Sequence, residues 1–93
     1  MSAVLTAKEE QLQNEQMLGN SAQHAYDDFI REFCEAKREA LFDSFRQLPL
    51  TAELEMMEVK RMLAAVDTLE GDILTVINTG KMASITLDKE VKH

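Results

Sequence analysis

The segment QLPLTAELE, residues 47–55, decides how this chain folds, because it separates two long helix-forming stretches. Pro49 cannot donate a backbone hydrogen bond and disfavours helical geometry at the residue before it, so the first stretch is expected to end there. Thr51 can cap the next helix, and Glu53 and Glu55 put negative charge in its first turn, where the helix dipole favours it. Two helices joined by so short a turn must run antiparallel. The segment predicts a long helical hairpin.

The stretch after this turn predicts a helix over about residues 52–78. Its apolar residues recur at steps of three and four, the spacing of a coiled-coil seam. They are Val59, Met62, Val66, Leu69, Ile73 and Val76. Gly80 is expected to end this helix in a left-handed conformation. The surrounding NTGK sequence is not expected to bind a nucleotide, because a phosphate-binding loop needs a glycine where Thr75 stands.

The stretch before the turn predicts a helix over about residues 22–48, with an apolar stripe of its own. Phe29, Phe33 and Phe45 in this stripe are expected to interdigitate with the aliphatic seam. Two helices alone leave much of both stripes in water, so either a shorter N-terminal helix packs across them or a second copy completes a four-helix bundle, and we favour the second copy. The predicted core and self-association surface therefore consists of these three phenylalanines and the six aliphatic residues of the seam. A homo-oligomer is predicted.

The two ends of the chain carry weaker patterns. Thr6 followed by Glu9 predicts a short helix over about residues 7–18, and Gly-Asn-Ser at 19–21 is expected to interrupt it. Residues 84–93 begin with polar and apolar residues in alternation, which predicts an extended or flexible tail in which Ile85 and Leu87 are candidate partner contacts. The whole chain, residues 1–93, is expected to form one all-α domain.

The composition indicates which functions to expect. Seventeen acidic residues against ten basic ones give a net charge of −7, which disfavours direct binding to nucleic acid. A single cysteine, Cys34, forms no disulfide within the chain and suits a reducing cytoplasm. His24 lies near two aspartates, but two ligand types in one place do not make a metal site. No apolar run is long enough to span a membrane. No acid–base pair or activated nucleophile is recognisable, so we expect no enzyme and no cofactor.

One part of the sequence resembles known proteins. The runs EALFDSFRQLP and LAAVDTLEGDILTVINTGKMA, within about residues 39–83, look like small helical proteins encoded among the head and packaging genes of tailed bacteriophages and prophages. The resemblance implies a non-enzymatic role in virion assembly, carried out in the cytoplasm of a bacterial host. It carries no functional residues over to this chain.

Two functional hypotheses follow from these patterns. The first is a structural or assembly accessory protein that associates with itself and with other proteins through its helices. The alternative is a small acidic regulator that covers a basic surface of a protein that handles nucleic acid.

Overall fold

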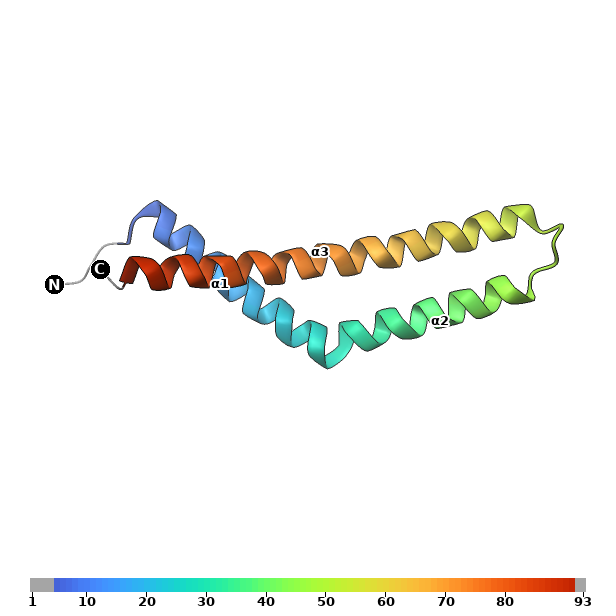
Figure 1. Cartoon of the computed structure of the whole chain (residues 1–93), viewed down its shortest axis with the longest axis horizontal. Helices are drawn as coiled ribbons and strands as arrows, with labels where there is room; N and C mark the ends of the chain where they lie inside the picture. Colours follow the sequence, from blue (N-terminus) through green and yellow to red (C-terminus); the bar gives the residue numbers. More distant parts are fainter. Residues whose placement is uncertain (1–4, 92–93) are drawn as a thin grey trace.

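The computed structural model describes residues 5–91 as a long helical hairpin (Figure 1). Its first arm consists of α1 (Ala7–Ala25), the π-helical turn η1 (Tyr26–Ile30) and α2 (Arg31–Gln47), which follow one another without a break. The second arm is a single helix of 39 residues, α3 (Glu53–Val91). The predicted all-α antiparallel hairpin is confirmed. The last two residues of the predicted tail, 92–93, lie outside the described part of the chain.

The first arm ends as the sequence of the turn predicts, whereas Ala52, not the predicted cap Thr51, directly precedes α3. Leu48 leaves helical geometry, with φ −73° and ψ 137°, because Pro49 crowds the residue before it. The backbone N–H of Ala52 then donates to the carbonyl of Pro49 at 2.9 Å, and the carbonyl of Ala52 accepts from Met56 N–H at 3.0 Å. The predicted role of Pro49 in ending the first arm is confirmed, and α3 begins one residue after its predicted start.

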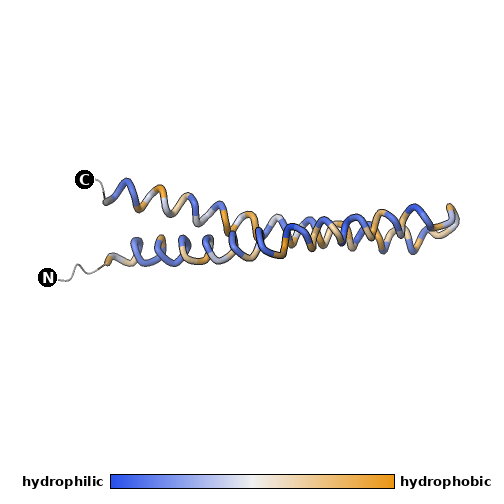
Figure 2. The backbone as a smooth tube through the Cα atoms, turned by 90° about the horizontal axis from the view of Figure 1, so that it is seen from below, coloured by the Kyte–Doolittle hydropathy of each residue, from blue (hydrophilic) through white to orange (hydrophobic). Residues whose placement is uncertain are grey.

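The molecule is a thin rod of 71 × 22 × 18 Å. Its radius of gyration is 19.9 Å, whereas a compact domain of this length would have about 12 Å. Both described ends lie at the same end of the rod, and polar and apolar positions alternate along both arms (Figure 2). Each arm therefore has only the other arm to pack against.

The predicted helix breaks at Gly19 and Gly80 are wrong, because both glycines lie inside continuous helices. Among the described residues no glycine has a positive φ. The two glycines instead meet each other at the contact of α1 with α3, the two helices that cross in Figure 1. Both are buried, and a Cβ added to Gly80 would lie 2.7 Å from the Cα of Gly19 and 2.9 Å from the carbonyl oxygen of Glu15. Here the absence of a side chain lets two backbones touch.

The predicted extended tail is also wrong over its described part, because α3 continues to Val91. The hydroxyl of Ser84 accepts a hydrogen bond from the side-chain amide of Gln16 at 3.0 Å. Thr86 donates to the carbonyl four residues earlier at 3.0 Å, as threonine does inside helices. An alternation of four residues is too short a signal to stop a helix whose far turns still contact the other arm.

The π-helical turn explains which residues of the first arm face α3. Up to Tyr26, the residues of the first arm that α3 covers are alternately four and three residues apart in the sequence. After Tyr26 the next three, Ile30, Cys34 and Arg38, each follow four residues after the one before. One extra residue has entered the repeat. The N–H of Arg31 bonds the carbonyl of Tyr26, five residues back, which is how a π turn absorbs such an insertion. The turn rotates α2 so that Cys34 and Leu41 face the partner arm.

Candidate protein-interaction surfaces

The hairpin has a very small core. Within residues 5–91 the buried apolar residues are Tyr26, Cys34, Leu41, Val59, Ile77 and Ala83. All four phenylalanines of the chain are exposed by between 44% and 65%. Monomeric proteins rarely leave this much large apolar side chain in water. The most unusual property of the molecule is therefore its apolar surface.

Most of the predicted core lies on that surface. Of the nine residues, Val59 is buried, and Val66 and Ile73 are half-buried. The other six are exposed, at 65% for Phe29, 48% for Phe33, 44% for Phe45, 43% for Met62, 50% for Leu69 and 40% for Val76. The interdigitation predicted for the phenylalanines is thus not found for Phe29 and Phe33, because the arms are in contact along a narrower line than the apolar stripes cover.

The contact line also contains residues that the sequence analysis missed, because they are small or polar. Gly19, Cys34 and Gly80 are buried in it, although none belongs to an obvious apolar stripe. On α3 the covered positions repeat by three and four from Met56 to Leu87, with Glu70 in the middle. This unbroken repeat was the available signal, and it predicts a helix that continues beyond Gly80.

One flank of the contact line is closed by an ion-pair network. Arg38 donates to Asp67 at 2.8 Å and to Glu70 at 2.5 Å, and the Tyr26 hydroxyl donates to the second oxygen of Glu70 at 3.1 Å. Hydrogen bonds to Asp67 and then to Glu70 raise the pKa of the Arg38 guanidinium. Arg31 lies over the Tyr26 ring, 4.8 Å from its centroid. This network holds the π turn against the middle of α3.

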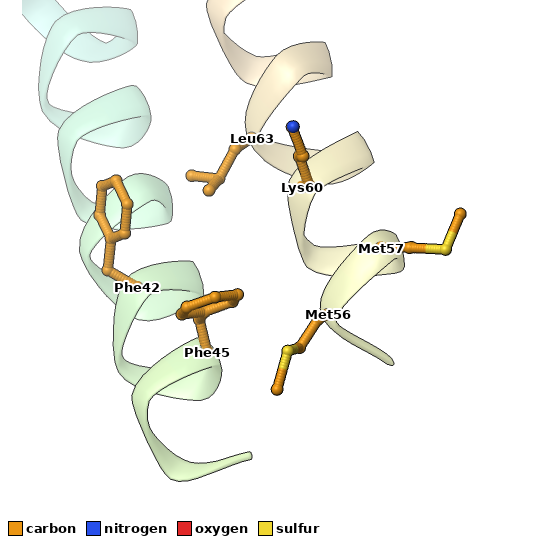
Figure 3. A pocket seen from close by; sticks show the side chains of 6 residues that line it. All are labelled: Phe42, Phe45, Met56, Met57, Lys60 and Leu63. Atoms are coloured by element: carbon orange, nitrogen blue, oxygen red, sulfur yellow. The ribbon is translucent and has the colours of Figure 1, made fainter. Parts of the chain in front are cut away.

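The same flank opens into a groove near the turn (Figure 3). It has a volume of about 400 Å³. We call it the tip groove, and it is lined by Phe42, Phe45, Met56, Met57, Lys60 and Leu63. Phe45 and Leu63 point into the space between the arms, whereas Met57 points outward (Figure 3). Methionine and aromatic side chains suit contact with another apolar chain, because they adapt to its shape.

Within residues 5–91, the opposite flank carries no such network. On two antiparallel helices, residues that directly precede contact positions lie on one flank, and residues that directly follow them lie on the other. Asp67 follows Val66 and Phe42 follows Leu41, which places both on the network flank. Met62, Leu69 and Val76 directly precede contact positions of α3, and Phe33 directly precedes Cys34. We call these four residues and Phe29, whose ring stacks on Phe33 with centroids 5.6 Å apart, the apolar flank.

Two further candidate groups of the sequence are Cys34 and His24. Cys34 is completely buried, and burial raises the pKa of its thiol, which lowers its reactivity. His24 is exposed in the last turn of α1, and no cluster of three or more metal-ligating side chains exists in the described range. Over the same range, no helix combines the length and the apolar character that crossing a bilayer requires.

Ile85 and Leu87, the predicted partner contacts, take different positions on α3. Ile85 is 49% exposed, whereas Leu87 is half-buried. A role for Ile85 in partner binding therefore stays a prediction. Comparison of the chain with protein-family models, with curated proteins and with solved structures finds no match, so no residue role is carried over from another protein.

Proposed function

We propose that this protein is a non-enzymatic assembly module, which works by packing its exposed apolar side chains against another protein, first of all another copy of itself. The observation that carries the proposal is the exposure of all four phenylalanines on a hairpin with a very small core. These side chains leave a large apolar area in contact with water, and an interface with another protein can cover that area.

The size of that area is sufficient for association. Covering the exposed half of one phenylalanine removes roughly 100 Å² from water, which contributes about 2.5 kcal/mol at about 25 cal/mol per Å². Association costs on the order of 4–15 kcal/mol in lost freedom. Several aromatic and aliphatic residues covered together therefore suffice, whereas one alone does not.

Sedimentation velocity at micromolar concentration tests the proposal. We expect a dimer or a larger assembly in dynamic equilibrium with the chain of 10.5 kDa. A helical, stable monomer at all concentrations up to about 100 μM, which also captures no partner from its host, would contradict it. The resemblance to phage head and packaging proteins supports virion assembly in a bacterial cytoplasm as the setting, and a portal, terminase or coat gene beside its own gene would strengthen that assignment.

The net charge of −7 supports one alternative, an acidic regulator that covers a basic protein surface. Salt distinguishes the two mechanisms. Binding through apolar side chains persists or strengthens between 50 mM and 500 mM NaCl, whereas charge-driven binding weakens steeply, because counterions screen it. A partner released by salt alone would therefore favour the regulator.

A further inference from the structure

The two flanks of the hairpin differ in charge directly beside the contact line of α3, from Val59 to Gly80. On α3, the residues that directly follow the alternate contact positions Val59, Val66, Ile73 and Gly80 are Lys60, Asp67, Leu74 and Lys81, of which three are charged. Those that directly precede the alternate contact positions Leu63, Glu70 and Ile77 are Met62, Leu69 and Val76, none of which is charged. Asp72, which precedes Ile73, lies on the same flank but farther from the contact line. A partner that excludes water therefore covers Met62, Leu69 and Val76 without burying a charge of α3 directly beside the contact line.

The first arm extends this apolar flank at the level of Leu69. Tyr26 and Arg38 lie on either side of Phe33 in the sequence, and both bond Glu70. The segment that contains Phe33 therefore runs alongside the segment that contains Leu69. Phe29 stacks on Phe33 and is 65% exposed, so the two arms together present a continuous apolar surface.

We propose that a second copy of the chain docks on the apolar flank, antiparallel to the first, about a two-fold axis that passes beside Leu69 and Phe33. Met62 and Val76 are each seven residues from Leu69. Such an axis therefore puts Leu69 against its own copy and Met62 against the partner's Val76. The result is a four-helix bundle in which like arms lie next to each other. This inference rests on the proposed function and specifies the surface and the geometry that self-association uses.

The first arm fits the same axis. Phe29 and Lys37 are each four residues from Phe33, so the axis brings Lys37 of one copy over the partner's Phe29. An ammonium group over an exposed aromatic ring is a favourable contact, and its aliphatic stem covers apolar surface. Lys37 is the one charged residue of α2 near the axis that directly precedes a contact position, which is Arg38. Its side chain thus meets an aromatic face in place of another charge.

The area of the apolar flank matches the requirement of a specific dimer. Its five residues are between 40% and 65% exposed. With roughly 200 Å² for each aromatic side chain and somewhat less for each aliphatic one, they present roughly 500 Å² per copy. Pairing of two copies buries roughly 1,000 Å², the lower limit of stable interfaces. We therefore expect a dissociation constant in the micromolar range.

Disulfide trapping tests the geometry. Leu69→Cys puts a thiol beside the axis, and Leu74→Cys, on the network flank, is the matched control. Both variants retain Cys34, which is buried and therefore not expected to react. Under mild oxidation we expect the first variant to form a covalent dimer at least ten times faster than the second. Equal rates in the two variants would overturn the proposed axis.

Charge substitution tests the surface independently. Leu69→Asp puts two carboxylates at the axis, and we expect the dissociation constant to rise at least about 100-fold, whereas Leu74→Asp leaves it within about three-fold. Circular dichroism establishes that both variants fold, since both positions are exposed. A dimer that Leu69→Asp does not weaken overturns this inference but leaves the proposed self-association standing. A wild-type chain that stays monomeric overturns both.

Discussion

Replacement of Gly80 by alanine tests the crossing of the two arms. The new Cβ would lie 2.7 Å from the Cα of Gly19 and 2.9 Å from the carbonyl oxygen of Glu15. Ordinary contact requires about 3.5–4.0 Å, and both opposing atoms belong to backbone, which cannot rotate away. The arms must therefore separate by about 1 Å at this point. Ile77 and Ala83, which are 3% and 2% exposed, then lose part of their packing.

The magnitude follows from two opposing effects. Alanine in place of glycine in a helix interior stabilises by about 0.5–1 kcal/mol. Overpacking costs about 1–3 kcal/mol, and a gap of 0.5–1 Å forfeits a quarter to a half of the dispersion energy of each contact beside it. We therefore expect Gly80→Ala to lower the free energy of unfolding by a net amount of about 1–3 kcal/mol.

Gly71→Ala is the matched control, because it changes the same helix by the same atom. A Cβ at Gly71 meets nothing within 4 Å, so only the gain in helix propensity remains, and we expect the free energy of unfolding to rise by about 0.5–1 kcal/mol. The free energies of unfolding of the two variants should therefore differ by roughly 1.5–4 kcal/mol, with one below and the other above the wild type.

Urea unfolding followed by circular dichroism at 222 nm measures both changes. All variants must be compared at one protein concentration, because association shifts apparent stability. The midpoint should fall for Gly80→Ala and rise for Gly71→Ala, with the m-value unchanged. Gly19→Ala should behave like Gly80→Ala. If all three variants gain stability by similar amounts, the helices do not cross at these glycines and the reasoning is refuted.

Three further predictions concern other contacts. Tyr26→Phe removes one hydrogen bond to Glu70, so unfolding in urea should require about 0.5–1.5 kcal/mol less; an unchanged midpoint would mean that the bond does not hold the π turn. Burial raises the pKa of the Cys34 thiol. The neutral buried thiol therefore contributes its full stabilisation at pH values below the ordinary pKa of 9.0, and this contribution is lost as the pH rises through the pKa of the thiol in the folded protein. A disulfide reagent at pH 8 should therefore label it only on unfolding, and rapid labelling of folded protein would argue against burial. Truncation after Ala83 removes the hydrogen bond between Gln16 and Ser84, so the loss of ellipticity should exceed that of the deleted residues; a proportional loss would show that the tail does not support α1.

The pattern of residues was enough to predict the hairpin. Pro49 ends one helix through steric and hydrogen-bonding effects that act within a few residues. The spacing of apolar residues by three and four indicates a helix and not a strand. Both effects are local, so the sequence expresses them directly. The phenylalanine positions were a weaker guide, because a stripe on a helix can face either the other arm or a second molecule.

Local reasoning was wrong at Gly19, Gly80 and the tail, and the reason is the same in each case. A glycine has a low helix propensity wherever it stands, so taken singly it indicates a helix end. Only the arrangement of the two arms brings Gly19 and Gly80 together and turns a local cost into a close contact. The π turn has the same origin, because the extra residue before Cys34 matters only when α2 must keep facing α3.

The sequence by itself determined that this protein is helical, where its two arms turn and which residues are apolar, because propensity, proline geometry and period act over one or two turns of chain. The tertiary structure alone decided which apolar residues are covered, because two helices in contact along a narrow line can bury only a part of each stripe. It covered small residues such as Gly19, Cys34 and Gly80 at that line, and it left the phenylalanines on the surface, where another chain can reach them.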